Sequence, residues 1–191
     1  MIRRILRRGW RIWERIFCRL YHLQDVPSEG IKLLKIGVQP YRGKRIILQD
    51  NTEINPGDMV ACLHLNSEQA LLLHQPGSSS LRTGVKFLRQ AKWAWKGLRE
   101  MVEREDIPSE VKAFYSVTLF YRGVLAHGME VRETSDWTRA WQSLYLRWLM
   151  VLYHPTGWQR LKTRKEVWAP KEIWISKQQL LSHRNDTHQR K

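Results

Sequence analysis

The residues best suited to chemistry are a histidine and an asparagine at the end of a predicted strand. His64 is the penultimate residue of the apolar run Met59–Leu65, and Asn66 directly follows that run. Groups at the carboxyl end of a strand, beside the N-terminus of a helix, are well placed to meet a ligand. There His64 could act as a general base and Asn66 as an orienting or oxyanion group. The alternative is structural, with a core histidine followed by a helix cap.

A catalytic pocket would need further polar groups from elsewhere in the chain. His127 and His154 are the candidates, and with His64 and Asn66 they define one hypothesis, a small enzyme acting on an anionic lipid-linked or glycan substrate. None of the seven histidines pairs at the spacing of metal ligands. There is also no glycine-rich phosphate loop after a strand and no G-x-S-x-G elbow. We therefore expect no metal and no cofactor, and we lean toward a protein without catalytic activity.

The strongest functional pattern is a basic amphipathic helix predicted over residues 1–24. Its apolar positions recur at steps of three and four and form one stripe, made of Ile2, Ile5, Leu6, Gly9, Ile12, Trp13, Ile16 and Leu20. Seven arginines flank the stripe, against the single acid Glu14. Apolar burial at the headgroup level plus attraction to anionic lipid is how monotopic helices attach to membranes.

The residues expected to contact a membrane are Arg3, Arg4, Arg7, Arg8, Trp10, Arg11, Trp13 and Arg15. Tryptophan suits the headgroup level, and each basic residue near an anionic surface contributes about 1 kcal/mol. The alternative is that the stripe packs on the core of the domain and the arginines form a solvated face. The sequence leaves both interpretations open.

Positive charge extends over the whole chain. Its 191 residues include 33 Lys+Arg against 18 Asp+Glu, a formal net charge of +15. Such an excess usually reflects an anionic partner. The candidates are an anionic membrane surface, another polyanion, or nucleic acid. Nucleic-acid binding has its best candidate in residues 92–96, where Trp93 and Trp95 stand between lysines and could stack on bases if exposed. No helix-turn-helix, RRM or KH signature accompanies them.

Composition also bears on location. The arginines interrupt any uncharged run near the N-terminus that could serve as the apolar region of a signal peptide. No stretch approaches the roughly 18 apolar residues of a transmembrane helix. Cys18 and Cys62 stand between apolar neighbours and are interpreted as small core residues. We expect a cytoplasmic protein, with attachment to the inner face of the membrane as the corollary of the basic helix.

The apolar periodicity predicts an α+β domain over residues 25–183, after the helix of residues 1–24 and before a polar tail of residues 184–191. Strands are expected over residues 33–41, 44–49, 59–65, 111–121, 130–133 and 172–176, the first two joined by a turn at Arg42–Gly43. Helices are expected over residues 68–74, 81–104 and 177–183 and between Asp136 and His154. We expect a small, mainly antiparallel sheet packed by two or three long helices, without alternating βαβ units.

Several short motifs resemble, in their order, the YkoP-like domain family. They lie at residues 41–43 (YRG), 47–50 (ILQD), 56–58 (PGD), 63–66 (LHLN), 128–131 (GMEV), 153–157 (YHPTG), 167–176 (VWAPKEIWIS) and 180–181 (LL). The resemblance covers about residues 5–183. One departure is Met129, where an aromatic residue is expected in similar sequences.

Proteins of that family occur alone in bacteria and as a domain C-terminal to polysaccharide deacetylases. The resemblance therefore implies envelope or polysaccharide enzymes as partners. It implies no activity, because the metal-binding motifs of the deacetylase belong to the other domain and have no counterpart here. The interpretation that joins these patterns is a non-catalytic protein, peripheral on a membrane, that works beside polysaccharide-modifying enzymes. A small enzyme and a nucleic-acid-binding protein remain the alternatives.

Overall fold

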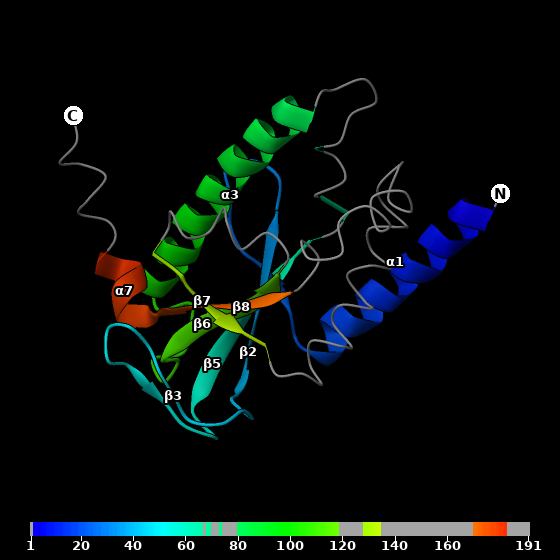
Figure 1. Cartoon of the computed structure of the whole chain (residues 1–191). Coiled ribbons are helices and arrows are strands. Elements are labelled where there is room, and N and C mark those ends of the chain that lie inside the picture. Colours follow the sequence, from blue (N-terminus) through cyan, green and yellow to red (C-terminus); the bar gives the residue numbers. More distant parts are fainter. Residues whose placement is uncertain are drawn as a thin grey trace, which may run out of the picture.

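The computed structural model describes residues 2–66, 68–69, 73, 80–118, 128–134 and 170–182. Over these residues the chain forms short strands and helices of very different length (Figure 1). The elements in chain order are α1 (Ile2–Leu20), β1 (Gln24–Asp25), β2 (Leu34–Pro40), β3 (Ile46–Ile47), β4 (Glu53–Ile54), β5 (Met59–Leu65), α3 (Ser80–Glu103), β6 (Ala113–Thr118), β7 (Glu130–Glu133), β8 (Lys171–Ser176) and α7 (Lys177–Ser182).

Six strands form one mixed sheet in the order β1-β2-β5-β6-β8-β7. Four neighbouring pairs are antiparallel, and β5 and β6 run parallel. Parallel neighbours need a crossover of a dozen or more residues, usually a helix, and α3 lies in that crossover. The α+β class and the mainly antiparallel sheet are confirmed. We expected no alternating βαβ units, and among the described strands β5, α3 and β6 form a single βαβ connection.

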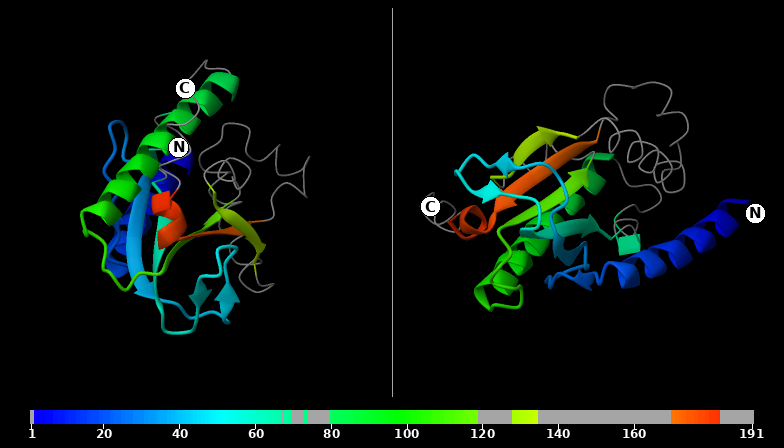
Figure 2. Two further views of the ribbon diagram at one scale, coloured as in Figure 1. Left: turned by 90° about the vertical axis from the view of Figure 1, so that its left-hand side faces the viewer. Right: turned by 90° about the horizontal axis from the view of Figure 1, so that it is seen from below.

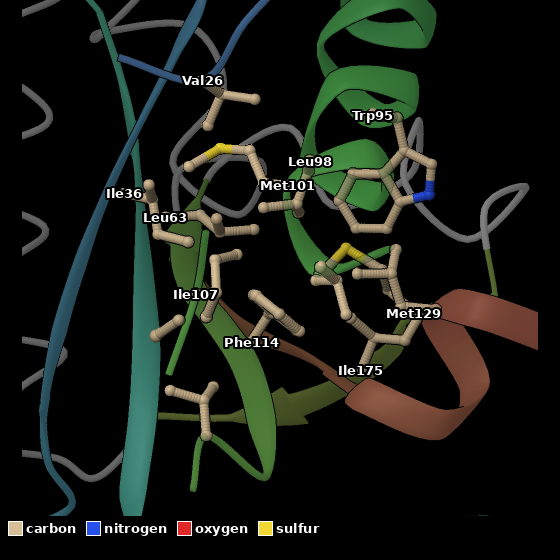
Figure 3. Packing of buried hydrophobic residues seen from close by; sticks show 14 of the residues in the cluster. Val26, Ile36, Leu63, Trp95, Leu98, Met101, Ile107, Phe114, Met129 and Ile175 are labelled. Carbon is tan, nitrogen blue, oxygen red and sulfur yellow. The ribbon is translucent and has the colours of Figure 1, made fainter. Parts of the chain in front are cut away.

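α3 covers one face of this sheet. Strand side chains alternate between the two faces, and Ile36 of β2, Leu63 of β5 and Phe114 of β6 all point to the same side. There they pack with Leu98 and Met101 of α3 in the largest buried apolar cluster of the described residues (Figure 3). Burying one such side chain contributes roughly 1.5–3 kcal/mol, so this layer is a principal source of stability.

A small hairpin, β3 with β4, covers part of the opposite face. Leu48 and Ile54 pack there on Val60 of β5 and Trp174 of β8, and the ring of Tyr115 stacks on Trp174 with centroids 4.7 Å apart. The predicted strands at residues 33–41 and 44–49 are therefore not partners in one hairpin. β2 pairs with β5 and β3 pairs with β4, because alternation reveals a buried face but not the strand beside it.

The expected elements match the structure to different degrees. β5 and β7 have the predicted ends, and α3 begins and ends one residue earlier than predicted. Residues 55–58 form a turn before β5, with Gly57 at φ +94° and a hydrogen bond from the Asp58 amide to the Asn55 carbonyl. In the described residues α3 is the one long helix on its face of the sheet. The helix expected between Asp136 and His154 lies outside those residues, so the number of long helices stays a prediction.

Gly97 lets the segment before β2 cross α3 closely. A Cβ atom at Gly97 would lie 1.7 Å from the carbonyl oxygen of Pro27, whereas a Cβ at Gly84 in the same helix would meet nothing within 4 Å. We expect Gly97→Ala to lower the free energy of unfolding by about 1–3 kcal/mol through overpacking. Gly84→Ala should raise it by roughly 0.5–1 kcal/mol through helix propensity. Urea denaturation measures both values, and a Gly97→Ala protein as stable as Gly84→Ala would contradict the close crossing.

Candidate functional site

The C-terminus of α1 is fixed to the sheet by a short hydrogen-bonded turn. The amide of Leu23 donates to the Cys18 carbonyl at 2.8 Å, and the amide of His22 donates to the Arg19 carbonyl at 3.2 Å. His22 has a φ of +47°. This is the Schellman pattern, in which a left-handed residue ends a helix and satisfies its last carbonyl groups. β1 starts at Gln24 and pairs with β2, so α1 has a fixed direction relative to the sheet.

α1 docks on the face of the sheet opposite α3. The ring of Phe17 meets the ring of His64 edge-on, with centroids 5.0 Å apart. Gly37 of β2 permits the approach, since a Cβ there would lie 2.4 Å from the Leu23 side chain and 2.9 Å from the Tyr21 carbonyl oxygen. Figure 1 shows α1 and α3 on either side of the strands. α1 therefore docks on the sheet through Phe17, whereas the described large residues of its predicted apolar stripe, Ile12, Trp13, Ile16 and Leu20, stay exposed.

A small cavity lies between α1 and the sheet. It is lined by Trp13, Glu14, Phe17, Cys18, Leu23, Lys35, His64 and Leu65. Its volume is about 20 Å³, enough for roughly one water molecule. Pockets that bind small molecules are typically about 300–1,000 Å³. His64 therefore faces a packing gap and not a substrate-sized pocket.

The titratable groups around this cavity are not arranged as a reaction centre. Burial lowers the pKa of His64, so its imidazole is neutral. Burial also raises the pKa of the Cys18 thiol, which keeps it protonated and a poor nucleophile. Burial opposes the charge on Lys35, but the Asp25 carboxylate at 2.7 Å outweighs it and raises the pKa of Lys35. Likewise, despite burial, Lys35 and Lys32 hold the pKa of Asp25 below its usual value.

Asn66 does not line this cavity. Its side-chain oxygen accepts a hydrogen bond from the Gln69 amide at 3.2 Å, and its own amide donates to the Leu33 carbonyl at 2.8 Å. Asn66 is thus a helix cap, as the structural alternative predicted. His127 and His154 lie outside the described residues. Within those residues, no three His, Cys, Asp or Glu side chains gather closely enough to hold a metal ion.

The outward side of α1 is the most unusual surface of the described structure. Four large apolar side chains of α1 are exposed, and we call them the outer strip: Ile12 (57%), Trp13 (53%), Ile16 (47%) and Leu20 (70%). Trp13 stands at the edge of this strip, because it also lines the cavity. Arg15 and Arg19 are exposed on the same helix, and Trp10 is half-buried. α1 therefore packs on the domain with one part of its apolar surface and leaves another part in solvent. The predicted contact residues Arg3, Arg4, Arg7, Arg8 and Arg11 belong to α1, but their side chains lie outside the described part.

The aromatic residues proposed to stack on nucleic-acid bases are not free to do so. Trp95 is only 7% exposed and packs with the α3 side of the core. Trp93 is half-buried, and the guanidinium of Arg89 lies over its ring at 5.5 Å from the centroid. A stacking platform needs an open ring face. The main sequence argument for nucleic-acid binding thus loses its support.

Sequence reasoning missed a polar group on the α1 side of the sheet. The side-chain amide of Gln39 donates to the hydroxyl of Tyr115 at 2.5 Å, and Cys62 lies beside Tyr115. Burial raises the pKa of the Cys62 thiol to about 11, so this free cysteine is inert at neutral pH. It is half-buried, as is Cys18. Gly37 was also missed, although a glycine inside a strand is a known signal of close backbone approach.

These features define a class of protein: an α+β domain whose mixed sheet has a long helix on one face and a basic amphipathic helix on the other. The chain belongs to the YkoP domain family, which it matches over residues 3–184. A curated relative is "Uncharacterized protein YkoP" of Bacillus subtilis (strain 168), 20% identical over 122 residues, which are 64% of this chain and 67% of the relative. No solved structure matches. The family resemblance is confirmed.

Among the helices of the described residues, none has the length and apolar character needed to cross a bilayer.

The neutral state of His64 predicts a pH dependence of stability. Its pKa in the folded protein lies below the unfolded value of about 6.5, so the unfolded chain takes up the proton first as the pH falls. The free energy of unfolding contributed by this residue is therefore complete above about pH 6.5 and is lost progressively below it.

Replacing His64 should flatten this part of the profile. We expect His64→Gln and His64→Phe, the latter keeping a ring beside Phe17, to lose less stability than the wild type between about pH 6.5 and 5. Urea titrations across this range measure the slope. The control is His22→Asn, which alters an exposed histidine and keeps a residue type that tolerates a left-handed backbone. Equal slopes in all four proteins would refute a neutral, half-buried His64.

Proposed function

We propose that this protein attaches peripherally to an anionic membrane surface through α1 and acts there, without catalysis, beside enzymes that modify envelope polysaccharides. The observation that carries the proposal is the exposure of the outer strip on a helix that is already docked on its own sheet. Soluble proteins rarely leave contiguous apolar surface in water, and such a surface rimmed by polar residues is typical of an interaction site.

The chemistry of α1 fits a lipid headgroup region. The outer strip runs from Ile12 to Leu20, about 12 Å along the helix axis, and ends in the fixed turn before β1. Each apolar side chain moved out of water contributes roughly 1.5–3 kcal/mol. Arg15 and Arg19 add attraction to anionic headgroups, about 1 kcal/mol each near the surface. Trp13 is the residue type that prefers the headgroup level.

The rest of α1 extends the same arrangement. Its sequence continues the apolar stripe through Ile2, Ile5 and Leu6 and adds five more arginines before Ile12. Anionic lipid is concentrated in the cytoplasmic leaflet, and the inner face of the membrane is accordingly the proposed location. The link to polysaccharide enzymes rests on the family resemblance alone. The enzyme alternative has weaker support, because the cavity beside His64 admits only about one water molecule.

Vesicle co-sedimentation of the full-length protein tests this proposal. We expect binding to vesicles that contain phosphatidylglycerol, weaker binding to pure phosphatidylcholine vesicles, and loss of binding as salt rises. Ile12→Gln with Ile16→Gln should lower the partition coefficient at least tenfold, since two apolar anchors are removed. The matched control is Val85→Gln with Leu88→Gln, which removes two equally exposed apolar side chains from α3.

Two results would reject the membrane assignment. One is an absence of binding to anionic vesicles by the wild-type protein at low salt. The other is an equal loss of binding in the α1 and α3 double variants, which would mean that any exposed apolar residue contributes alike. Analytical ultracentrifugation belongs to the same test. A dimer that Ile12→Gln with Ile16→Gln abolishes, without vesicle binding, would make the outer strip an interface between two copies of the chain.

A further inference from the structure

α3 carries a second concentration of positive charge. Residues 80–99, the first twenty of the helix, include no acid and six basic residues: Arg82, Lys86, Arg89, Lys92, Lys96 and Arg99. The first acids of the helix are Glu100 and Glu103, near its C-terminus. Acidic residues normally favour the first turns of a helix and basic ones the last, so this distribution opposes the helix dipole. Helix stability therefore does not explain it.

Four of these six cations, Arg82, Arg89, Lys92 and Lys96, are exposed on the side of α3 that faces away from the core. Ala94, Leu98 and Trp95 are buried against other elements. The exposed side, which we call the outer face of α3, consists of Arg82, Val85, Leu88, Arg89, Lys92 and Lys96. Val85 and Leu88 are 60% and 54% exposed.

Part of this charge is available to a partner. Lys96 is engaged by Glu29 and Glu100. Arg89 and Lys92, by contrast, make no ion pair within the part of the chain that the structure describes. The two lie on adjacent turns of the exposed side, so their charges add at one place.

The outer face of α3 is directed away from the surface proposed to meet the membrane. α3 and α1 pack on opposite faces of the sheet, through Leu63 and through His64 respectively. The N-terminal half of α3 extends past the strands, at the end of the molecule opposite the β3–β4 hairpin (Figure 2). A bilayer lying against the outer strip of α1 would therefore leave the outer face of α3 in solvent.

We infer that the outer face of α3 binds a linear polyanion without bases, such as an acidic or phosphate-bearing polymer. From Arg82 to Lys96 the cations extend over about 21 Å of one helix face, which suits a chain of repeated negative charges better than a single compact anion. Here cations outnumber apolar side chains, the reverse of the outer strip of α1, so a polymer fits this face better than a bilayer. Bases are disfavoured because Trp95 is buried and Arg89 covers Trp93. This inference goes beyond membrane attachment and does not depend on it.

Fluorescence anisotropy with labelled long-chain inorganic polyphosphate, in the absence of vesicles, tests the assignment on the full-length protein. Arg89→Gln with Lys92→Gln should weaken binding on the order of tenfold or more and make its salt dependence shallower. The matched control is Arg15→Gln with Arg19→Gln, which removes the same charge from α1 and should change the affinity by less than about threefold. Competition by polygalacturonate then distinguishes carboxylate from phosphate as the preferred anion. The four substituted residues of the two double variants are all exposed. Thermal unfolding should confirm that both variants are folded.

The outcomes are distinct from those of the vesicle experiment. Equal loss of polyphosphate affinity in the two double variants would show that net charge alone attracts the polymer, and would overturn the site. A single-stranded oligonucleotide of equal charge that binds tenfold more tightly than polyphosphate would overturn the exclusion of bases. The Arg89/Lys92 variant should retain wild-type vesicle binding, and the Ile12/Ile16 variant should retain polyphosphate binding. The membrane proposal and the polyanion proposal can therefore be rejected independently of each other.

Discussion

Both layers that cover the sheet depend on β5. Ala61 and Leu63 of this strand point toward α3, while Val60 meets the β3–β4 hairpin and His64 meets α1. Since successive side chains of a strand point to opposite faces, one residue of register decides which helix each of them contacts. The strand is apolar on both faces because it is covered on both. β5 is also internal in the sheet, with β2 antiparallel on one side and β6 parallel on the other.

The sequence predicted those parts of the fold that local pattern controls. β5 and β7 have strong strand composition, α3 has a long helical period, and Asn66 is a cap by residue type and position. The sequence could not predict which strands pair with one another. The pairing of β2 with β5 and the parallel pairing of β5 with β6 join segments far apart in the chain, and periodicity contains no information about such pairs. The short strands β1 and β4 have too few residues to form a pattern.

The candidate site on α1 was also predicted only in part. The helical period predicted an apolar stripe on α1, and its described large members Ile12, Trp13, Ile16 and Leu20 are exposed. A period cannot show which side of a helix another element covers, and α1 docks through the ring contact between Phe17 and His64, with Leu23 close to Gly37. His64 was singled out for chemistry because of its place at a strand end. In the structure the His64 ring instead contacts the Phe17 ring of α1. Burial lowers its pKa, and the neutral imidazole packs against the helix.

The order of strands in the sheet also has a consequence for synthesis of the chain. β7 hydrogen-bonds to β8, which is the last of the described strands to be made. While the ribosome is still adding residues before Lys171, β7 lacks its partner in the described sheet and β6 has only β5 beside it there. Completion of the described sheet therefore waits for residues 171–176, as expected for a topology rich in distant contacts. α1, in contrast, precedes every strand of the described sheet in the chain, so its residues are made before that sheet can close.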